Sequence, residues 1–323
     1  MSEFALIDAL RARTSVARRD VALGIGDDAA LLAVPDGQQL VACTDTLVAG
    51  IHFLPDTAPE DLGWRALAVN LSDLAAMGAE PAWALLALTL PQALPRFIDR
   101  FAAGFAELAR AHGVALVGGD TTQGPLAVTV TALGCVPPGR ALTRRGAKAG
   151  DAVFVTGTLG DAVAALYGLR DGNFGSGRTT VAPALLTALN RPQPRLAAGL
   201  ALRGIATACI DVSDGLLADL GHVCALSGVG AELDADALPV SAALAATFEH
   251  AACIDMALAG GDNYELCFTA PAARAAEVAR VLAQVPGGVT HIGRIVAGSG
   301  VVARDAHGAR VVTRSAGWEH FAR

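Results

Sequence analysis

The residues best suited to chemistry are seven aspartates, each of which adjoins a glycine or stands at the end of an expected element. They are Asp27, Asp28, Asp45, Asp73, Asp120, Asp211 and Asp214. Hard cations such as Mg²⁺ take carboxylate oxygen, keep some of their water and are commonly completed by substrate phosphates. Carboxylates crowded together without a metal would repel one another and raise each other's pKa. The pattern therefore predicts a phosphate-chain ligand that arrives with several Mg²⁺ ions, provided that the aspartates converge.

The acidic glycine turn at residues 24–30 allows two other interpretations. It matches a degenerate dinucleotide fingerprint, Gly-x-Gly-x-x-Ala, with Asp45 near the position of the ribose-binding acid. Asp27 and Asp28 would then place two like charges where the pyrophosphate belongs, which argues against a nicotinamide-dependent oxidoreductase. The plainest alternative is a turn whose aspartates are simply solvated. The phosphate loop Gly-x-x-x-x-Gly-Lys-Ser/Thr does not occur in the sequence.

Three other side chains are candidates for ligand contacts. His52 follows Asp45 closely, on a loop that leaves the same expected strand. The guanidinium of Arg144 could make paired hydrogen bonds to phosphate oxygens, although a solvated linker charge is the alternative. Trp318, near the end of the chain, would be a core residue on base rates alone.

Periodicity predicts the strand that carries Asp45 and the helix that carries Asp73. An expected strand at residues 39–48 carries Asp45, and a helix beginning near residues 57–60 continues to about residue 77. Asn70 and Asp73 lie on the inward stripe of that helix, which is costly unless a polar or metallic partner meets them.

The remaining candidates are carried by four further segments. Residues 83–90 predict a fully buried strand, and residues 114–117 predict a strand that ends before Gly119 and Asp120. A strand at residues 206–210 leads into Asp-Val-Ser-Asp-Gly, and the apolar spacing after it predicts a helix with Ser213 at its N-cap. A glycine-rich loop is expected at residues 172–177.

Composition limits the class of protein. The 323 residues are 53% apolar and 17% charged, which predicts two domains with ample core material. Alternating strands and helices predict an α/β or α+β protein with a boundary near residues 137–150, and we place the domains at 1–140 and 141–323. A net charge of −7 gives no attraction for nucleic acid or anionic membrane. The six cysteines are scattered without a C-x-x-C pair, and the N-terminus does not resemble a signal peptide, so a cytoplasmic location is expected.

Six ordered motifs between residues 24 and 268 closely resemble the thiamine-monophosphate kinase family. They are Gly-Ile-Gly-Asp-Asp-Ala, Thr-Asp-Thr-Leu-Val-Ala-Gly-x-His-Phe, Ala-Val-Asn-Leu-Ser-Asp-Leu-Ala-Ala-Met-Gly-Ala, Gly-Gly-Asp-Thr-Thr, Asp-Val-Ser-Asp-Gly-Leu and Gly-Gly-Asp-Asn-Tyr-Glu-Leu-Cys-Phe. The wider superfamily includes aminoimidazole ribonucleotide synthetase, selenophosphate synthetase and a hydrogenase maturation factor. Another ATP-dependent activation within this superfamily is therefore an alternative function.

The resemblance implies an N-terminal sheet that closes a barrel across a homodimer, a C-terminal α/β domain, and ATP held through Mg²⁺. It implies metal contacts by Asp27, Asp28, Cys43, Thr44, Asp45, Asp73, Asp120, Asp211 and Asp214. It implies ATP contacts by Gly119, Asp120, Arg144 and Ser213, and thiamine monophosphate contacts by His52, Asp262 and Trp318. Among these residues, Asp73, Asp120, Arg144 and Asp211 are the expected catalytic group.

Three positions depart from the family pattern. Cys43 stands where serine is usual, so a metal contact there must use the backbone oxygen. Asp262 and Asn263 replace the usual Glu-Asp pair, which shortens one acidic side chain and removes one charge. Trp318 occupies a place where the type of aromatic residue varies.

The implied reaction is a direct phosphoryl transfer without a phosphoenzyme. A phosphate monoester has its second pKa near ~6, so the acceptor oxygen is already anionic at neutral pH and needs no strong general base. Catalysis then consists of alignment and charge neutralisation. The thiazolium cation of thiamine would be favoured by the Asp262 carboxylate and by the Trp318 ring, the latter by roughly 0.5–2 kcal/mol.

Overall fold

The computed structural model describes residues 3–171, 181–315 and 317–319. The glycine-rich loop expected at residues 172–177 lies outside this part of the chain. The chain divides into two compact units, of which the first comprises Met1–Leu74 and Ala79–Gly139. The second comprises Ala75–Gly78 and Arg140–Arg323. Each unit has its own sheet and its own helices.

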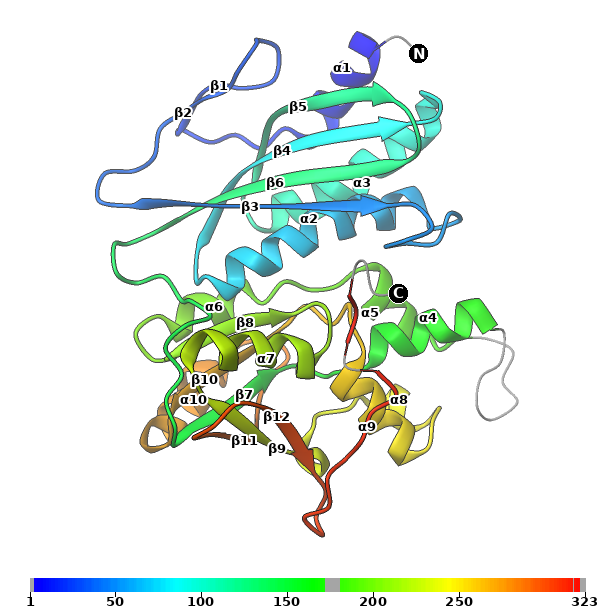
Figure 1. Ribbon diagram of the computed structural model, residues 1–323. Helices are drawn as coiled ribbons and strands as arrows, with labels where there is room; N and C mark the ends of the chain where they lie inside the picture. The colour runs from blue at the N-terminus through cyan, green and yellow to red at the C-terminus, as the bar shows by residue number, and fades with distance from the viewer. Residues whose placement is uncertain (1–2, 172–180, 316, 320–323) are drawn as a thin grey trace. The chain divides into compact units, whose positions relative to one another are not determined.

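The first unit is built on a four-stranded sheet in the order β3-β6-β4-β5. The strands are β3 (Gln39–Val48), β6 (Ala127–Val136), β4 (Glu80–Leu90) and β5 (Ala115–Gln123), and only the β4–β5 pair is parallel. Two long helices, α2 (Pro59–Ala76) and α3 (Pro95–Ala111), lie on one face of this sheet (Figure 1).

The two helices approach each other at glycines. A Cβ on Gly104 would stand 1.8 Å from the carbonyl oxygen of Glu60, and one on Gly63 would stand 2.1 Å from that of Phe101. Any larger residue would push the helices apart, since both contacts are to backbone. The N-terminal helix α1 (Glu3–Thr14) also packs on α3.

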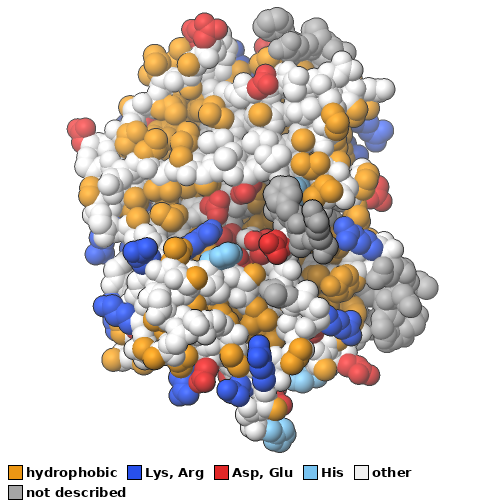
Figure 2. Space-filling model, viewed as in Figure 1, with side chains coloured by type: hydrophobic (Ala, Val, Ile, Leu, Met, Phe, Trp, Pro, Cys, Tyr) orange, Lys and Arg blue, Asp and Glu red, His pale blue; other side chains and the backbone are white. Residues whose placement is uncertain are grey.

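The opposite face of the sheet is open over much of its area. Leu85 and Ala87 are exposed on β4, whereas Leu86 and Leu88 between and beside them are buried. The expectation of a fully buried strand was therefore wrong, because helices cover only one face and an uninterrupted apolar run does not reveal this. Apolar side chains gather over this unit's sheet in Figure 2, and Leu40 of β3 is 50% exposed.

A short hairpin covers one end of that open face. Its strands are β1 (Val21–Leu23) and β2 (Leu31–Leu32), which pair antiparallel. Val21 and Leu32 pack with Trp83 and Leu133 in a small apolar cluster. The acidic glycine turn therefore joins two antiparallel strands and does not join a strand to a helix. This geometry excludes the dinucleotide interpretation, which requires a helix N-terminus directly after the turn.

The second unit contains a six-stranded sheet in the order β12-β9-β11-β7-β10-β8, antiparallel except for β12–β9. The strands are β7 (Asp151–Thr156), β8 (Ala208–Val212), β9 (Gly230–Asp234), β10 (Glu265–Pro271), β11 (Val289–Val296) and β12 (Gly300–Arg304). The inner strand β7 and the edge strand β8 are both buried along their whole length, so both faces of the sheet are covered there.

Helices surround this second sheet. They are α4 (Asp161–Asp171), α5 (Pro183–Asn190), α6 (Leu196–Leu202), α7 (Leu216–Ser227), α8 (Ala242–Ala245), α9 (His250–Ala259) and α10 (Ala275–Leu282), with the 3₁₀ turns η1 (Ala235–Ala237) and η2 (Ala272–Arg274). Both units thus mix strands and helices, which confirms the expected mixed class. Within the described ranges no helix has the length and apolar character to cross a membrane. All six cysteines are free thiols.

Candidate active site

One acidic group of the first unit forms where β3 faces α2. The Sγ of Cys43 lies 3.3 Å from the carbonyl oxygen of Asn70, which joins the strand to the helix. Asn70 is fully buried, and its amide donates to the carbonyl oxygen of Ala66 at 3.1 Å. Burial raises the pKa of the Cys43 thiol, and the carboxylates of Asp73 and Asp45 raise it further. Cys43, Asp45 and Asp73 are therefore neighbours, as the resemblance implies.

The same pKa shift decides what Cys43 can do. Because its thiol keeps its proton at neutral pH, Sγ is a poor ligand for a hard cation, and a metal contact at this position would use the backbone oxygen. Thr44 projects to the other face of the strand. Its hydroxyl lies 3.0 Å from the hydroxyl of Thr131 and 3.1 Å from the carbonyl oxygen of Val130. A metal contact by Thr44 on the Asp45 side would likewise be limited to the backbone.

Asp27 and Asp28 are exposed in the turn between β1 and β2. Gly26 has φ +125°, a backbone conformation that favours glycine, and the Asp28 amide donates to the Asp27 carboxylate at 2.9 Å. The segment before the hairpin is anchored at Asp20, which accepts from Arg18 at 2.6 Å and from the indole of Trp83 at 3.3 Å. The turn is thus held at its base, with its two carboxylates directed toward solvent.

Gly119 and Asp120 lie within β5, and the strand extends through them to Gln123. Gly119 has φ +149°, and a Cβ there would stand 1.8 Å from the carbonyl oxygen of Leu86. The register pairs Asp120 with Ala87 on the open face, whereas Asp45 faces α2. Because β3 and β5 are opposite edges, three strand spacings or roughly 14 Å apart, Asp120 and Asp45 of one chain cannot bind the same ion.

A second acidic group belongs to the loop between β8 and α7. Asp211, the second-to-last residue of β8, is 4% exposed. The loop that follows the strand runs through Ser213 and Asp214 to Gly215. The N-cap of α7 is Gly215, with φ +126°. The prediction of Ser213 as the N-cap was therefore wrong. A carboxylate from inside the helix, that of Asp219, instead accepts the amides of Ser213, Asp214 and Gly215, which precede the first helical residue.

Asp219 is a buried residue beside the predicted ligands Asp211 and Asp214 that sequence reasoning missed. It is 3% exposed, and its pKa is raised to about 7 by burial and by the charges of Asp211 and Asp214, against the hydrogen bonds that it accepts. A signal was present in the sequence. Asp219 lies on the apolar stripe of α7 with Leu216 and Leu220, the same argument that singled out Asp73 in α2.

Backbone hydrogen bonds connect this loop to two predicted substrate residues. The amide of Asp262 donates to the carbonyl oxygen of Ser213 at 2.7 Å. The amide of Trp318 donates to that of Asp214 at 2.9 Å. The structure thus brings together residues that the resemblance assigns to metal, nucleotide and thiamine phosphate.

Arg144 lies on a segment that runs beside β8. The carbonyl oxygen of the preceding residue, Thr143, accepts the amide of Cys209 at 2.9 Å, two residues before Asp211. The Arg144 side chain is exposed, and the segment continues past the start of β8, where Gly146 adjoins the carbonyl oxygen of Thr207. In the first unit, His52 is half-buried, and its Nδ1 accepts the Val48 amide at 2.9 Å, which leaves the ring proton on Nε2.

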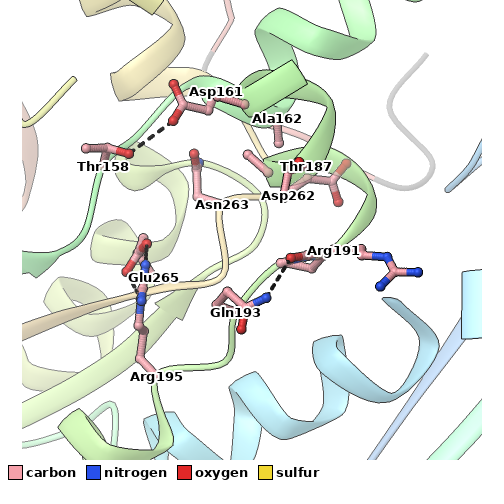
Figure 3. A pocket seen from close by; sticks show the side chains of 13 residues that line it. Thr158, Asp161, Ala162, Thr187, Arg191, Gln193, Arg195, Asp262, Asn263 and Glu265 are labelled. Atoms are coloured by element: carbon pink, nitrogen blue, oxygen red, sulfur yellow. Dashed lines mark hydrogen bonds and ion pairs between the residues drawn. The ribbon is translucent and has the colours of Figure 1, made fainter. Parts of the chain in front are cut away.

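A pocket of about 210 Å³ opens beside Asp262 in the second unit (Figure 3). It is lined by Thr158, Asp161, Ala162, Ala184, Thr187, Ala188, Arg191, Pro192, Gln193, Arg195, Asp262, Asn263 and Glu265. Burial raises the pKa of Asp161, although hydroxyl groups of Ser241 and Thr158 donate to its carboxylate at 2.6 and 3.1 Å. Three carboxylates and two guanidinium groups line the pocket, so its formal charge favours a cation.

Strained backbone holds the acidic residue at the pocket. Asp262 and Tyr264 have φ +62° and +53°, a backbone region that residues other than glycine rarely adopt. Asn263 between them accepts the Gly160 amide at 2.8 Å and donates to the Gly260 carbonyl oxygen at 2.6 Å. An amide suits both partners, whereas a carboxylate in this conformation would face the Gly260 carbonyl oxygen. The departure from the family at Asn263 is therefore compensated locally.

The donor chemistry fits hard cations, although the protein side chains alone do not form a closed site. Considering only the described residues, no three His, Cys, Asp or Glu side chains are grouped so as to hold a metal ion. In each unit, however, expected ligands raise the pKa of a buried neighbour, Cys43 in one and Asp219 in the other. These carboxylates create a negative potential that a Mg²⁺ ion completed by phosphate oxygens would neutralise.

Comparison with known proteins agrees with this arrangement. Residues 26–136 match the family described as AIR synthase related protein, N-terminal domain, and residues 148–306 match its C-terminal domain. Thiamine-monophosphate kinase of Escherichia coli K12 is 46% identical over 99% of this chain and 98% of its own length. The crystal structure of thiamine-monophosphate kinase from Stenotrophomonas maltophilia K279a is 50% identical, with a TM-score of 0.86 over 94% of this chain and 96% of that one.

A third similar protein has been solved with ligands. The structure described as AaThiL complexed with AMPPCP and TMP is 33% identical, with a TM-score of 0.77 over 99% of this chain and 97% of that one. Family matches to most of the chain and close full-length relatives establish membership. The chain belongs to the thiamine-monophosphate kinase family of AIR synthase related proteins.

Proposed function

We propose that the protein transfers the γ-phosphoryl group of ATP directly to the phosphate of thiamine monophosphate, giving thiamine diphosphate and ADP. The observation that carries the proposal is the loop at residues 211–215. Its backbone is bonded to Asp262 and Trp318, while its acidic side chains match the metal-binding motif of the family. A relative with 33% identity has been solved with AMPPCP and TMP together, which supports the same pair of substrates.

The acceptor needs alignment more than activation. The phosphate of thiamine monophosphate has its second pKa near ~6, so one of its oxygens carries a full negative charge at neutral pH. The barrier then arises mainly from bringing two anionic phosphates together. Positioning and charge neutralisation are the terms that lower it.

The residues at the end of β8 would perform both tasks. Asp211 and Asp214 would hold Mg²⁺, which when bound neutralises phosphate charge and orients the γ-phosphoryl group. In the first unit, Asp45 and Asp73 would hold Mg²⁺ together with the backbone oxygens of Cys43 and Thr44. The Arg144 guanidinium would add a charge-assisted, bidentate contact to a phosphate, and Ser213 would contact ATP.

The organic part of the substrate would lie against the acidic pocket. Thiamine carries a permanent thiazolium charge, and the Asp262 carboxylate faces that pocket (Figure 3). The indole of Trp318, which is 50% exposed, would supply an aromatic face to the cation. His52, with its proton on Nε2, would donate a hydrogen bond to the substrate.

We also propose a homodimer that closes the open sheet face of the first unit into a barrel. A four-stranded sheet with exposed Leu40 and Leu85 has an uncovered face and two free edges, and closure across a second copy would remove both. Asp120 cannot share an ion with Asp45 of its own chain. A second copy would bring Asp120 and Gly119 to the phosphates from the other side. The free cysteines favour a cytoplasmic location.

Mass analysis of the product tests the function. Purified protein with ATP, Mg²⁺ and thiamine monophosphate is expected to give equimolar thiamine diphosphate and ADP. ADP without thiamine diphosphate would refute the proposed acceptor and would point to another small molecule as the substrate. Absence of any ATP turnover under these conditions would refute the kinase assignment.

A further inference from the structure

A single carboxylate organises the loop that carries the second acidic group. The Oδ2 atom of Asp219 accepts the amides of Ser213, Asp214 and Gly215, at 3.0, 3.0 and 3.1 Å. Three consecutive backbone amides thus converge on one buried oxygen, an arrangement known from anion-binding nests. Here the anion belongs to the protein itself.

Two carbonyl oxygens of the same loop accept hydrogen bonds from the segments that carry the predicted substrate residues. Those of Ser213 and Asp214 accept the amides of Asp262 and Trp318. A Cβ on Gly317, which precedes Trp318, would stand 2.9 Å from the Asp214 carbonyl oxygen, so this approach is close. The two peptide units between residues 213 and 215 are therefore fixed from both sides, by Asp219 through their amides and by the two substrate-site segments through their carbonyls.

An aspartate is an expensive choice for a helix start in this place. Its carboxylate is 3% exposed and stands near the charges of Asp211 and Asp214, which together with burial raise its pKa. A serine or asparagine at the N-cap would bind the amides of the first helical turn without adding a third negative charge, but it would leave the amides of residues 213–215 without this acceptor. What only a buried acceptor inside the helix provides is simultaneous binding of all three amides from one point.

We propose that Asp219 is a positioning residue that couples the two substrate sites through the backbone of residues 213–215. It touches neither substrate. By fixing the amides it sets the direction of the Asp214 side chain, and by fixing the orientation of the two carbonyl groups it holds Asp262 and Trp318 in register with that side chain. The inference rests on the proposed function, since it assigns the two sites to ATP and thiamine monophosphate.

Two variants test this role against a matched control. Asp219→Asn keeps an oxygen of similar position but loses the charge, and Asp219→Ala removes the acceptor. Asp151→Asn is the control, because Asp151 is also buried, at 5% exposure, and accepts the Lys148 amide at 3.0 Å and the Thr207 hydroxyl at 2.7 Å elsewhere in the same unit. A residue that merely stabilises the fold would behave as this control does.

The kinetic expectation concerns both substrates together. We expect KM for ATP and for thiamine monophosphate to rise by roughly 10- to 100-fold in Asp219→Ala, as is typical when a residue supporting ligands is removed. Asp219→Asn should show a smaller rise of the same kind, and Asp151→Asn should leave both constants near their wild-type values, because Asp151 lies at the start of β7 and binds neither residues 213–215 nor the substrate-site segments. A rise in only one KM, or equal effects in the control, would overturn the coupling.

Hydrogen exchange gives a readout that needs no turnover, and its wild-type arm needs no variant. In the ligand-free wild-type protein the amides of residues 213–215 should be protected, and Asp219→Asn should lower their protection while β10 stays unchanged. Exchange of these amides at the rate of an exposed loop in the wild type would refute the proposal, even if no variant folds. Failure of the wild type to make thiamine diphosphate would instead refute the proposed function and leave the exchange result interpretable.

Discussion

The ion pair at the base of the pocket yields the prediction with the best-defined magnitude. Arg195 donates from Nε to Oε2 of Glu265 at 2.6 Å and from Nη2 to Oε1, and the Thr156 hydroxyl donates to Oε2 at 2.6 Å. The two side chains are 16% and 6% exposed. Burial raises the pKa of Glu265, which the Arg195 guanidinium opposes. Because water barely reaches this site, each of the two charged side chains is stabilised mainly by the other.

Glu265→Gln removes one charge and directs an amide NH₂ at a guanidinium donor. Breaking a buried pair in this way typically costs about 3–5 kcal/mol, because the remaining charge is left uncompensated. The double variant Glu265→Leu with Arg195→Met should lose less than the single variant, since neither charge then remains buried. Glu277→Gln is the matched control. Its pair with Arg274 has a similar 2.7 Å distance but 36% exposure on both sides, so about 0–1 kcal/mol is expected.

Urea unfolding at neutral pH, with activity measured in parallel, would compare these variants. Because β10 begins at Glu265, directly after the segment that holds Asp262, we also expect KM for thiamine monophosphate to rise in Glu265→Gln before the protein unfolds. Equal stability losses in Glu265→Gln and Glu277→Gln would refute the reasoning. So would a double variant less stable than the single one, since the pair would then be stabilising in its own right.

Four further predictions concern the acidic groups. Asp73→Asn is expected to abolish turnover without changing the unfolding midpoint, and near-wild-type activity would count against a metal role. Cys43→Ala should leave the Mg²⁺ dependence of the rate unchanged, because the protonated thiol is not a ligand; a shifted Mg²⁺ titration would show otherwise. Mixing inactive Asp73→Asn and Asp120→Asn subunits should restore about a quarter of wild-type activity per dimer by random exchange if the two residues serve one site in trans, whereas no recovery would place both residues in the same chain. For Asp161, a folded-state pKa above the unfolded value means that the native state binds more protons, so its contribution to stability is present at acidic pH and is lost as pH rises through the folded pKa. Asp161→Asn should therefore raise the melting temperature more at pH 7 than at pH 4, and a gain independent of pH would refute this.

Local patterns were sufficient for most individual elements. The periodicity of residues 39–48 and 216–224 agrees with β3 and α7, because a strand edge and an apolar helical stripe leave a direct mark in the sequence. The polar residues on the inward stripe of α2 were likewise a sound signal, since Asn70 is fully buried with a partner. Two errors have different causes. The exposure of Leu85 depends on which face of the sheet the remote helices cover. Near Gly215 the partner is close in sequence, but a carboxylate inside the helix, that of Asp219, binds the preceding loop, and capping rules do not anticipate this.

The sequence by itself determined the chemistry that is available. Glycines beside aspartates, an Arg in a basic segment and an ordered series of motifs are local features, and they suffice to indicate a carboxylate-rich phosphate site and the family. Only the tertiary structure decided which groups meet. Strand alternation sends Thr44 away from Asp45, the sheet order separates Asp45 from Asp120, and backbone hydrogen bonds join Ser213 and Asp214 to Asp262 and Trp318. Each of these depends on pairing between distant segments, which is fixed by the burial of whole faces and leaves no mark at the residues themselves.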